Sequence, residues 1–140
     1  METSQATEVK PRLSDSEKIT INLGLVDLGQ IDLLVQEGFY SNRTDLIRTA
    51  IRNQLTTHAE VLRQTVARRS LVLGLQHFSR ADLEALRDKN QTMQLHVLGL
   101  ASIAHDVSPE LALETIASIN VLGALHASAE VKKALASRTR

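Results

Sequence analysis

The stretch Glu17-Lys18-Ile19-Thr20-Ile21-Asn22-Leu23 alternates polar and apolar side chains. Successive side chains of a β-strand point to opposite faces, so the apolar residues would share one face while Lys18, Thr20 and Asn22 share the other. A single strand with one apolar face is not stable alone, and only helical patterns lie close to it in the sequence. The pattern therefore predicts that this strand pairs with the same strand of a second chain and exposes rows of hydrogen-bonding side chains.

Two helical patterns follow the strand, separated by a short turn. Apolar residues at helical spacing predict a first helix over residues 27–37, and Gly38 ends it, as glycine commonly does just past a helix. Ser41 or Asn42 then provides the N-cap of a second helix. An apolar stripe without Gly or Pro predicts that this second helix runs unbroken over residues 43–69.

Strand, helix, glycine-containing turn and helix, with SNRTDLIRTAIRNQL opening the second helix, closely resembles the ribbon-helix-helix family of bacterial DNA-binding proteins, in particular its CopG-like branch. The resemblance covers residues 17–58. In that family the two strands of a dimer form an antiparallel ribbon that enters the major groove, and alternate ribbon side chains read base edges. The resemblance therefore implies that the base-contacting residues are Lys18, Thr20 and Asn22.

The chemistry of these side chains suits base recognition, because Lys donates to guanine acceptors, Asn can bridge adenine, and Thr offers a hydroxyl and a methyl group. The family also binds phosphates at the start of the second helix, where free backbone amides and the helix dipole favour anions. By position, the phosphate-contacting residues would be Ser41, Asn42, Arg43 and Thr44. Gly24, where the family often has proline, and Gly29 inside the first helix differ from the family pattern but touch no predicted DNA contact.

The charge balance restricts the kind of nucleic-acid binding that the chain can perform. Lys plus Arg and Asp plus Glu both number 16, so the formal net charge is zero. Neutrality argues against indiscriminate coating of nucleic acid, which needs many phosphate contacts, but allows a site-specific reader with a few well-placed cations. Aromatic residues make up only 2% of the chain, which disfavours the base stacking of single-strand binders. The partner that the family resemblance implies, double-stranded DNA, agrees with this composition.

From Ser70 onward the sequence repeats itself. The triplet Val-Leu-Gly begins at Val72, Val97 and Val121, and an acidic, leucine-rich segment that starts with a serine N-cap follows each copy. Apolar runs alternating with helical segments at one period predict parallel strands beneath helices, with close packing at the glycines. Three units are near the lower limit for such a stack. We therefore expect this half to pack on the long second helix, on its dimer mate or on a partner protein.

These patterns together predict an α+β chain in three parts. The first is a flexible arm at residues 1–16, where Lys10 and Arg12 either contact the phosphate backbone of DNA or belong to a solvated tail. The second, at 17–69, is a ribbon-helix-helix module for DNA binding and dimerisation, with an extended second helix. The third, at 70–140, is a small three-unit repeat of β-strand and α-helix with parallel strands. The sequence shows no signal peptide and no apolar run long enough to cross a bilayer, so we expect a cytoplasmic protein without membrane contact.

The histidines raise the question of a metal site. Alignment of the repeats places His77, Ser102 and His126 at equivalent positions. A compact α/β half after a ribbon-helix-helix module is also similar to the nickel-responsive repressors, but their metal site uses cysteine, and this chain has none. We therefore expect partly buried, hydrogen-bonded histidines and no metal.

No glycine-rich phosphate loop, HExxH or GxSxG occurs, so we predict no catalytic residue, no cofactor and no enzyme activity.

The leading hypothesis is a sequence-specific DNA-binding protein that acts as a transcriptional repressor, as a homodimer or a higher oligomer. One alternative is an antitoxin of a toxin-antitoxin pair, whose carboxyl-terminal half binds a partner protein. The repeats look able to fold alone, which lowers this alternative, because such partner-binding tails are often disordered until bound. Another alternative is an assembly protein that uses the ribbon only to dimerise.

Overall fold

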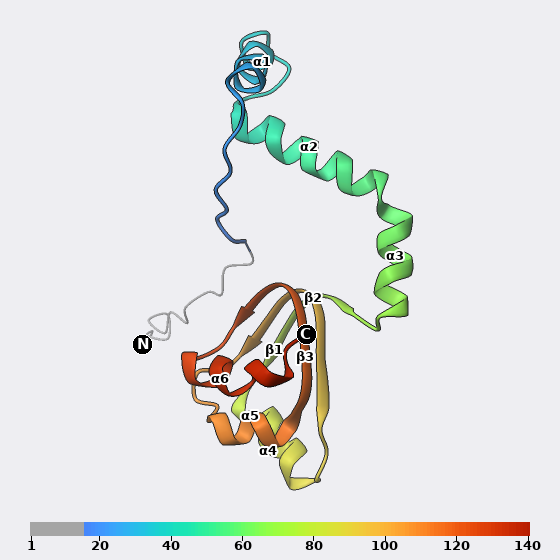
Figure 1. Ribbon diagram of the computed structural model, residues 1–140, viewed down its shortest axis with the longest axis vertical. Helices are drawn as coiled ribbons and strands as arrows, with labels where there is room; N and C mark the ends of the chain where they lie inside the picture. Colours follow the sequence, from blue (N-terminus) through green and yellow to red (C-terminus); the bar gives the residue numbers. More distant parts are fainter. Residues whose placement is uncertain (1–15) are drawn as a thin grey trace, which may run out of the picture.

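The computed structural model describes residues 16–140, and its mixture of helices with a parallel sheet fits the predicted α+β class (Figure 1). The predicted arm at residues 1–16, with Lys10 and Arg12, lies outside this description except for Ser16. The helices and strands are α1 (Leu25–Gln36), α2 (Arg43–Thr57), α3 (Ala59–Arg68), β1 (Val72–Phe78), α4 (Arg80–Asp88), β2 (Met93–Ile103), α5 (Pro109–Thr115), β3 (Ile116–His126) and α6 (Ala129–Ala134), followed by a short 3₁₀ helix at Ala136–Arg138.

The predicted first strand is not paired within a single chain. Residues 16–24 form no strand. A ladder needs a neighbouring strand, and the predicted neighbour is the same segment of a second chain, so the antiparallel ribbon stays a prediction. Helix α1 begins at Leu25 rather than at residue 27, and the predicted stop at Gly38 is confirmed by its φ of +85°, a conformation that favours glycine.

The prediction of an unbroken second helix is wrong. Helix α2 ends at Thr57 and α3 begins at Ala59, with a change of direction between them (Figure 1). Just before the break, Thr56 Oγ1 donates to the carbonyl of Arg52 at 2.9 Å, and Thr57 Oγ1 donates to that of Asn53 at 3.1 Å. Hydroxyls that bond back to the preceding turn bend helices. The prediction relied on the absence of Gly and Pro and overlooked this threonine pair.

The carboxyl-terminal segment from residue 70 onward, called the β/α half below, confirms the predicted parallel strands. Its sheet has the order β1-β2-β3, and both neighbouring pairs are parallel. The register aligns the Val-Leu-Gly triplets, so Gly74 lies beside Gly99 and Gly99 beside Gly123. The serines predicted as N-caps also act as caps, since each side chain accepts a hydrogen bond from a first-turn amide, in Ser79, Ser108 and Ser128.

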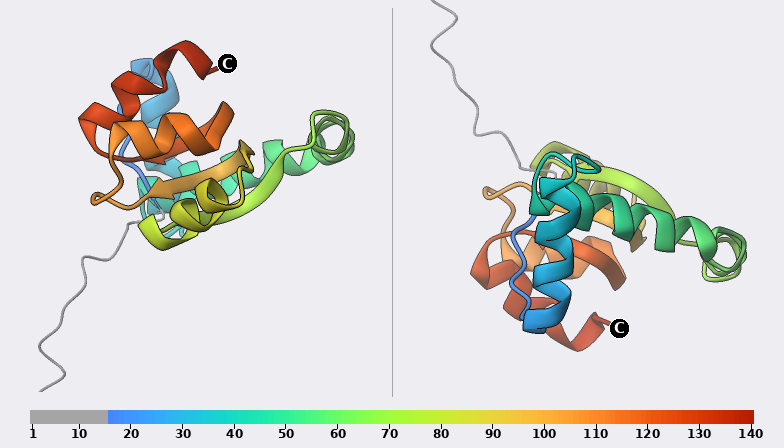
Figure 2. Two further views of the ribbon diagram at one scale, coloured as in Figure 1. Left: turned by 90° about the horizontal axis from the view of Figure 1, so that it is seen from below. Right: turned by 90° about the horizontal axis from the view of Figure 1, so that it is seen from above.

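The hydrophobic core lies between the sheet and its three helices. Right-handed connections that step across a parallel sheet in one direction place their helices on one face. Accordingly α4, α5 and α6 cover the same face, where Leu83, Leu95, Val97, Ile119 and Val131 are all 0% exposed. Helix α3 lies well apart from α5 and α6 in both views of Figure 2. The other face of the sheet therefore carries none of these three helices.

Candidate nucleic-acid interface

The amino-terminal helices have no core of their own within one chain. No residue of α1, α2 or α3 is buried. Large apolar side chains are instead exposed, including Ile19 at 74%, Leu25 at 85% and Leu33 at 58%. Apolar surface on this scale marks an interaction site in a folded protein.

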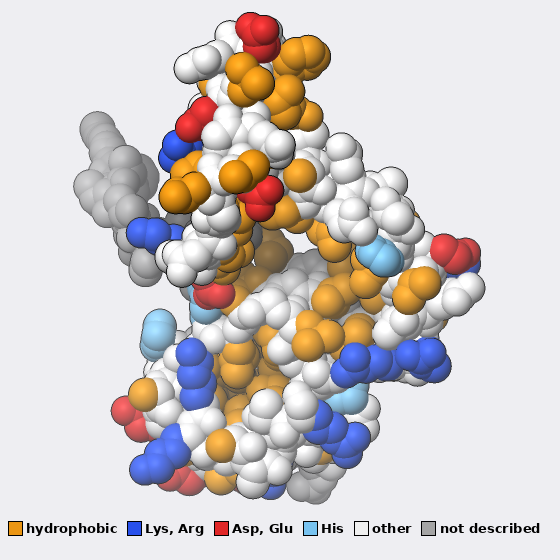
Figure 3. Space-filling view, turned by 45° about the horizontal axis from the view of Figure 1, so that its top comes forward, with side chains coloured by type: hydrophobic (Ala, Val, Ile, Leu, Met, Phe, Trp, Pro, Cys, Tyr) orange, Lys and Arg blue, Asp and Glu red, His pale blue; other side chains and the backbone are white. Residues whose placement is uncertain are grey.

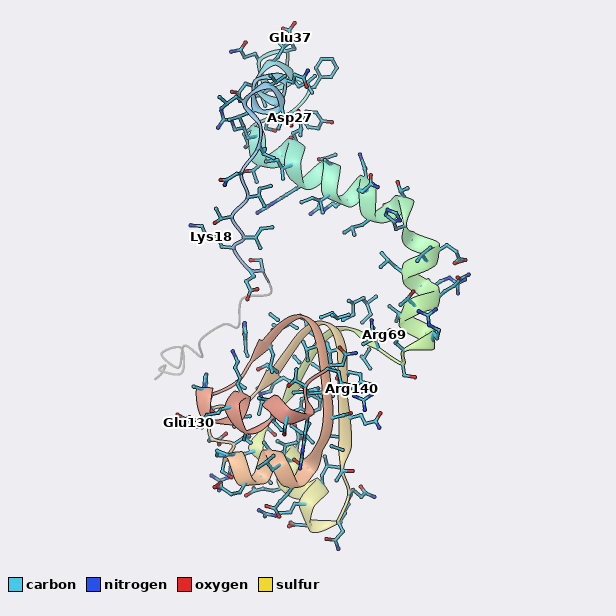
Figure 4. All side chains as sticks on the ribbon, in the orientation of Figure 1. Lys18, Asp27, Glu37, Arg69, Glu130 and Arg140 are labelled. Carbon is cyan, nitrogen blue, oxygen red and sulfur yellow. The ribbon has the colours of Figure 1, made fainter. Side chains whose placement is uncertain are left out.

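The predicted base-contacting residues lie on the extended segment before α1. Lys18, Thr20 and Asn22 are all exposed and alternate with the apolar residues, as the sequence pattern predicts. Figure 4 shows the Lys18 side chain projecting outward from this segment. Within the described residues, Lys18, Thr20 and Asn22 lie on a segment that pairs with no other strand and with no part of α2. Their role in base contact therefore stays a prediction.

The start of α2 is held by a compact set of hydrogen bonds. Asn42 is the N-cap, and its Oδ1 accepts from the backbone amide of Asp45 at 2.8 Å. In return, the Asp45 carboxylate accepts from the backbone amide of Ser41 at 3.0 Å and from its hydroxyl at 3.3 Å. Of the two predicted caps, Asn42 is the one observed. Both donors of Ser41 are therefore engaged within the chain, and a phosphate would have to compete with Asp45 for them.

Arg43 makes an ion pair that the sequence did not reveal. Its Nε and Nη2 donate to the two carboxylate oxygens of Asp32 in α1, both at 2.8 Å. These hydrogen bonds, with the attraction between the charges, lower the pKa of Asp32 and raise that of Arg43. The pair joins α1 to α2 and balances the charge of the Arg43 side chain with that of Asp32. The backbone amides of Arg43 and Thr44 lie in the first turn, where helix geometry leaves them without an acceptor inside the helix. These amides are the groups that an anion could bind.

Two arginines missing from the predicted site extend it along α2. Arg48 and Arg52 line a depression of about 380 Å³ together with Ser41, Asn42, Thr44, Asp45 and Thr49. Thr44, Arg48 and Arg52 are spaced four residues apart, which puts them on one face of the helix. Among residues 16–140, neither arginine takes part in an ion pair. The four-residue spacing from the helix start was the sequence signal that could have found them.

Two histidines of the β/α half lie within hydrogen-bonding distance of serines on neighbouring strands. His77 Nδ1 lies 2.9 Å from Ser102 Oγ, and His96 Nε2 lies 3.0 Å from Ser118 Oγ. The register also aligns Ser102 with His126, as the repeat alignment predicts. Within the described part of the chain, no three His, Asp or Glu side chains gather as metal ligands, and no helix is long and apolar enough to cross a membrane.

Comparison with known proteins identifies a family for this chain. A family model described as the ribbon-helix-helix transcriptional regulator family matches residues 14–132. No curated protein and no solved structure matches the chain. The family match extends from the segment before α1 into α6, and so takes in most of the β/α half as well as the amino-terminal helices.

Proposed function

The chain belongs to the ribbon-helix-helix transcriptional regulator family, and we propose that it is a homodimeric, sequence-specific DNA-binding protein that represses transcription. Regulators of this family bind DNA and dimerise, which sets the chain apart from enzymes. The observation that carries the proposal is the uncovered apolar surface of residues 17–23, α1 and α2, where a single chain fully buries no residue. A second copy of the same module would supply the missing core.

In the proposed dimer, residues 17–23 of the two copies pair as antiparallel strands and enter the major groove. Ile19 and Ile21 would face the shared core, because apolar and polar residues alternate between the two faces of a strand. Lys18, Thr20 and Asn22 would then face the base edges. Their donors and acceptors suit guanine and adenine contacts.

The start of α2 supports a second, sequence-independent contact with the DNA backbone. Backbone amides of the segment Ser41, Asn42, Arg43 and Thr44 would bind a phosphate, with help from the positive end of the helix dipole. We add Arg48 and Arg52 to this set, because both line the same polar depression and are free of ion pairs among the described residues. These two cations offset the neutrality of the chain at the place where phosphates would bind.

The β/α half favours this function over an antitoxin. Its helices and sheet enclose a core of completely buried side chains such as Leu83, Leu95 and Val131, all 0% exposed. A tail that orders only when a toxin binds would lack such a core. The folded half agrees with a regulator that carries its own second domain.

Binding of single variants to DNA tests the proposed reading surface. Genome-wide recovery of bound DNA would supply the best site, and fluorescence anisotropy would measure Kd on that site and on random duplex. Lys18→Ala, Thr20→Ala and Asn22→Ala should each cost about 1–3 kcal/mol on the best site and little on random DNA, because only base contacts are lost. Wild-type affinity in all three variants would show that the ribbon is not the reader.

Arg48→Ala tests the added phosphate contact in the same assay. It should weaken binding to both duplexes alike and lower the slope of log Kd against log salt by about 1, because one phosphate contact disappears. Lys132→Ala, which removes an exposed cation of α6, is the matched control and should leave the slope unchanged. Loss of the protein in its host should raise transcription from the bound promoter, and a fall would make it an activator instead.

A further inference from the structure

The sheet face opposite α4, α5 and α6 carries apolar side chains in rows. The strand register produces two rows, Leu73-Leu98-Leu122 and Leu75-Leu100-Ala124. At the β1 edge these rows are open, with Leu73 at 73% and Leu75 at 64% exposed. A half-covered parallel sheet is unusual, because parallel sheets normally have both faces buried.

This apolar face continues onto the long helical arm. A hollow of about 440 Å³ lies between them, lined mainly by the apolar residues Leu55, Ala59, Leu62, Val66, Leu73 and Leu98. Figure 3 shows hydrophobic side chains gathered around the hollow between the helices and the sheet. Leu55 belongs to α2, while Leu62 and Val66 belong to α3. The surface therefore runs from α2, along α3, to the sheet, with Thr56 and Arg63 as the polar residues of its lining.

The strands add no formal charge to this face, although Glu17 and Arg63 line the hollows beside it. None of the three strands contains Asp, Glu, Lys or Arg. Beyond the leucine rows it presents hydrogen-bonding groups, such as the His77–Ser102 pair. An uncharged strand surface suits its own copy, since two identical charged faces would repel one another across a symmetry axis. The strands themselves offer no charged side chain to a partner selected by charge.

We propose that the second copy of this chain covers this surface, so that α3 and the open sheet face of each subunit pack on the same surface of the other. The inference rests on the dimer proposed above, not on its DNA binding. A two-fold dimer interface uses the same patch on both subunits, and this patch is continuous with the one that dimerises. Once the ribbons pair, the sheets meet at a high effective concentration, so a modest apolar area is enough to hold them together.

Reactivity of a single introduced thiol tests whether the face is covered. The chain has no cysteine, so Leu73→Cys and Leu113→Cys each carry one thiol. Within one chain Leu73 is 73% exposed and Leu113, on the outer helix α5, is 37% exposed. An open face would thus make Leu73→Cys react with a maleimide at least as fast as the control. The proposal expects the reverse order in the full-length dimer, with Leu73→Cys slower by about tenfold or more.

A charged substitution tests whether the cover is the second copy. Leu73→Glu should raise the dimer Kd measured by sedimentation equilibrium about tenfold or more, because it would bury an unpaired carboxylate in each subunit. Leu113→Glu should leave that Kd unchanged, and circular dichroism of both variants would verify folding. If Leu73→Glu fails to fold, the same comparison is made with Leu73→Asn, which leaves a smaller polar group unpaired.

Two results would overturn the proposal. A fast-reacting Leu73→Cys would mean that the face is open, and a slow thiol with an unchanged dimer Kd would mean that the chain covers its own sheet. DNA binding by the same variants keeps this outcome separate from the proposed function. If the dimer binds its DNA site while the sheet face stays open, only this inference is contradicted. If the wild-type protein is a monomer, the proposed dimer is contradicted as well.

Discussion

At the scale of single residues, the row of glycines sets how closely the strands approach. Gly74, Gly99 and Gly123 have φ values of +124°, +141° and +120°, which side chains rarely adopt. A Cβ on Gly99 would overlap the carbonyl oxygen of Gly74, and one on Gly123 would overlap that of Gly99. At Gly74 nothing lies within 4 Å of such an atom. The three positions therefore share a backbone constraint, but only two share a steric one.

Alanine substitutions should separate these two constraints. Gly74→Ala should lower the free energy of unfolding by about 1–2 kcal/mol, because it adds only backbone strain. Gly99→Ala should lower it by more, since the strands must also move apart. Urea denaturation measures both, and Gly29→Ala in α1, where a Cβ meets nothing within 4 Å, is the control and should stabilise by about 1 kcal/mol. Equal stability of Gly99→Ala and wild type would contradict this account.

Residue by residue, the sequence was informative wherever the relevant partner was local. The serine caps and the stop at Gly38 depend on a few neighbouring residues, and these predictions are confirmed. Close packing at the glycines could also be predicted, but their positive φ depends on strand pairing and could not. The Arg43–Asp32 pair joins residues on different helices, so no local spacing indicates that this predicted phosphate ligand has another partner.

At the scale of secondary-structure elements, the break between α2 and α3 decides where the sheet lies relative to the DNA-binding module. Without a break, α2 and α3 would form one straight rod. The hydroxyls of the threonine pair before His58 donate to two carbonyl groups, at 2.9 and 3.1 Å, that also serve as acceptors for backbone amides in a regular helix. Sequence patterns of apolar residues detect helical character, but not this competition for carbonyl groups.

Replacement of both threonines should straighten the arm. Thr56→Ala combined with Thr57→Ala removes both side-chain hydrogen bonds and adds helix propensity of about 0.5 kcal/mol per residue. We expect a more negative ellipticity at 222 nm in circular dichroism and greater stability of the helical arm. Thr92→Ala, in the loop before β2, is a matched threonine control and should leave the helical signal unchanged. An unchanged signal in the double variant would show that the break has another cause.

At the scale of the whole molecule, the two parts of the chain differ in what they bury alone. The β/α half encloses its own core, whereas α1, α2 and α3 contain no buried residue. The strand repeat could be predicted because its strands pair with one another within one chain. The proposed ribbon, by contrast, would depend on a second chain, so its geometry would be a property of the dimer rather than of one copy.

Dilution should therefore loosen the two parts to different degrees. Below the dimer Kd, the amides of α1 and α2 should lose protection from hydrogen exchange, because the core they need is shared with the second copy. Amides of Leu95 and Val97 in β2, both 0% exposed beneath the helices, should keep their protection. Exchange followed by mass spectrometry at several protein concentrations measures both. Protection of α1 that does not depend on concentration would argue against a shared core.

The aligned triplets have a consequence for how such a chain can vary. Each strand and helix unit pairs only with its neighbours, in one register, at a nearly constant period. Adding or removing a unit would change the width of the sheet by one strand spacing, about 4.8 Å, and would leave residues 17–58 untouched. The β/α half can thus change its length in steps of one strand and helix unit, without altering the residues that we propose read the DNA.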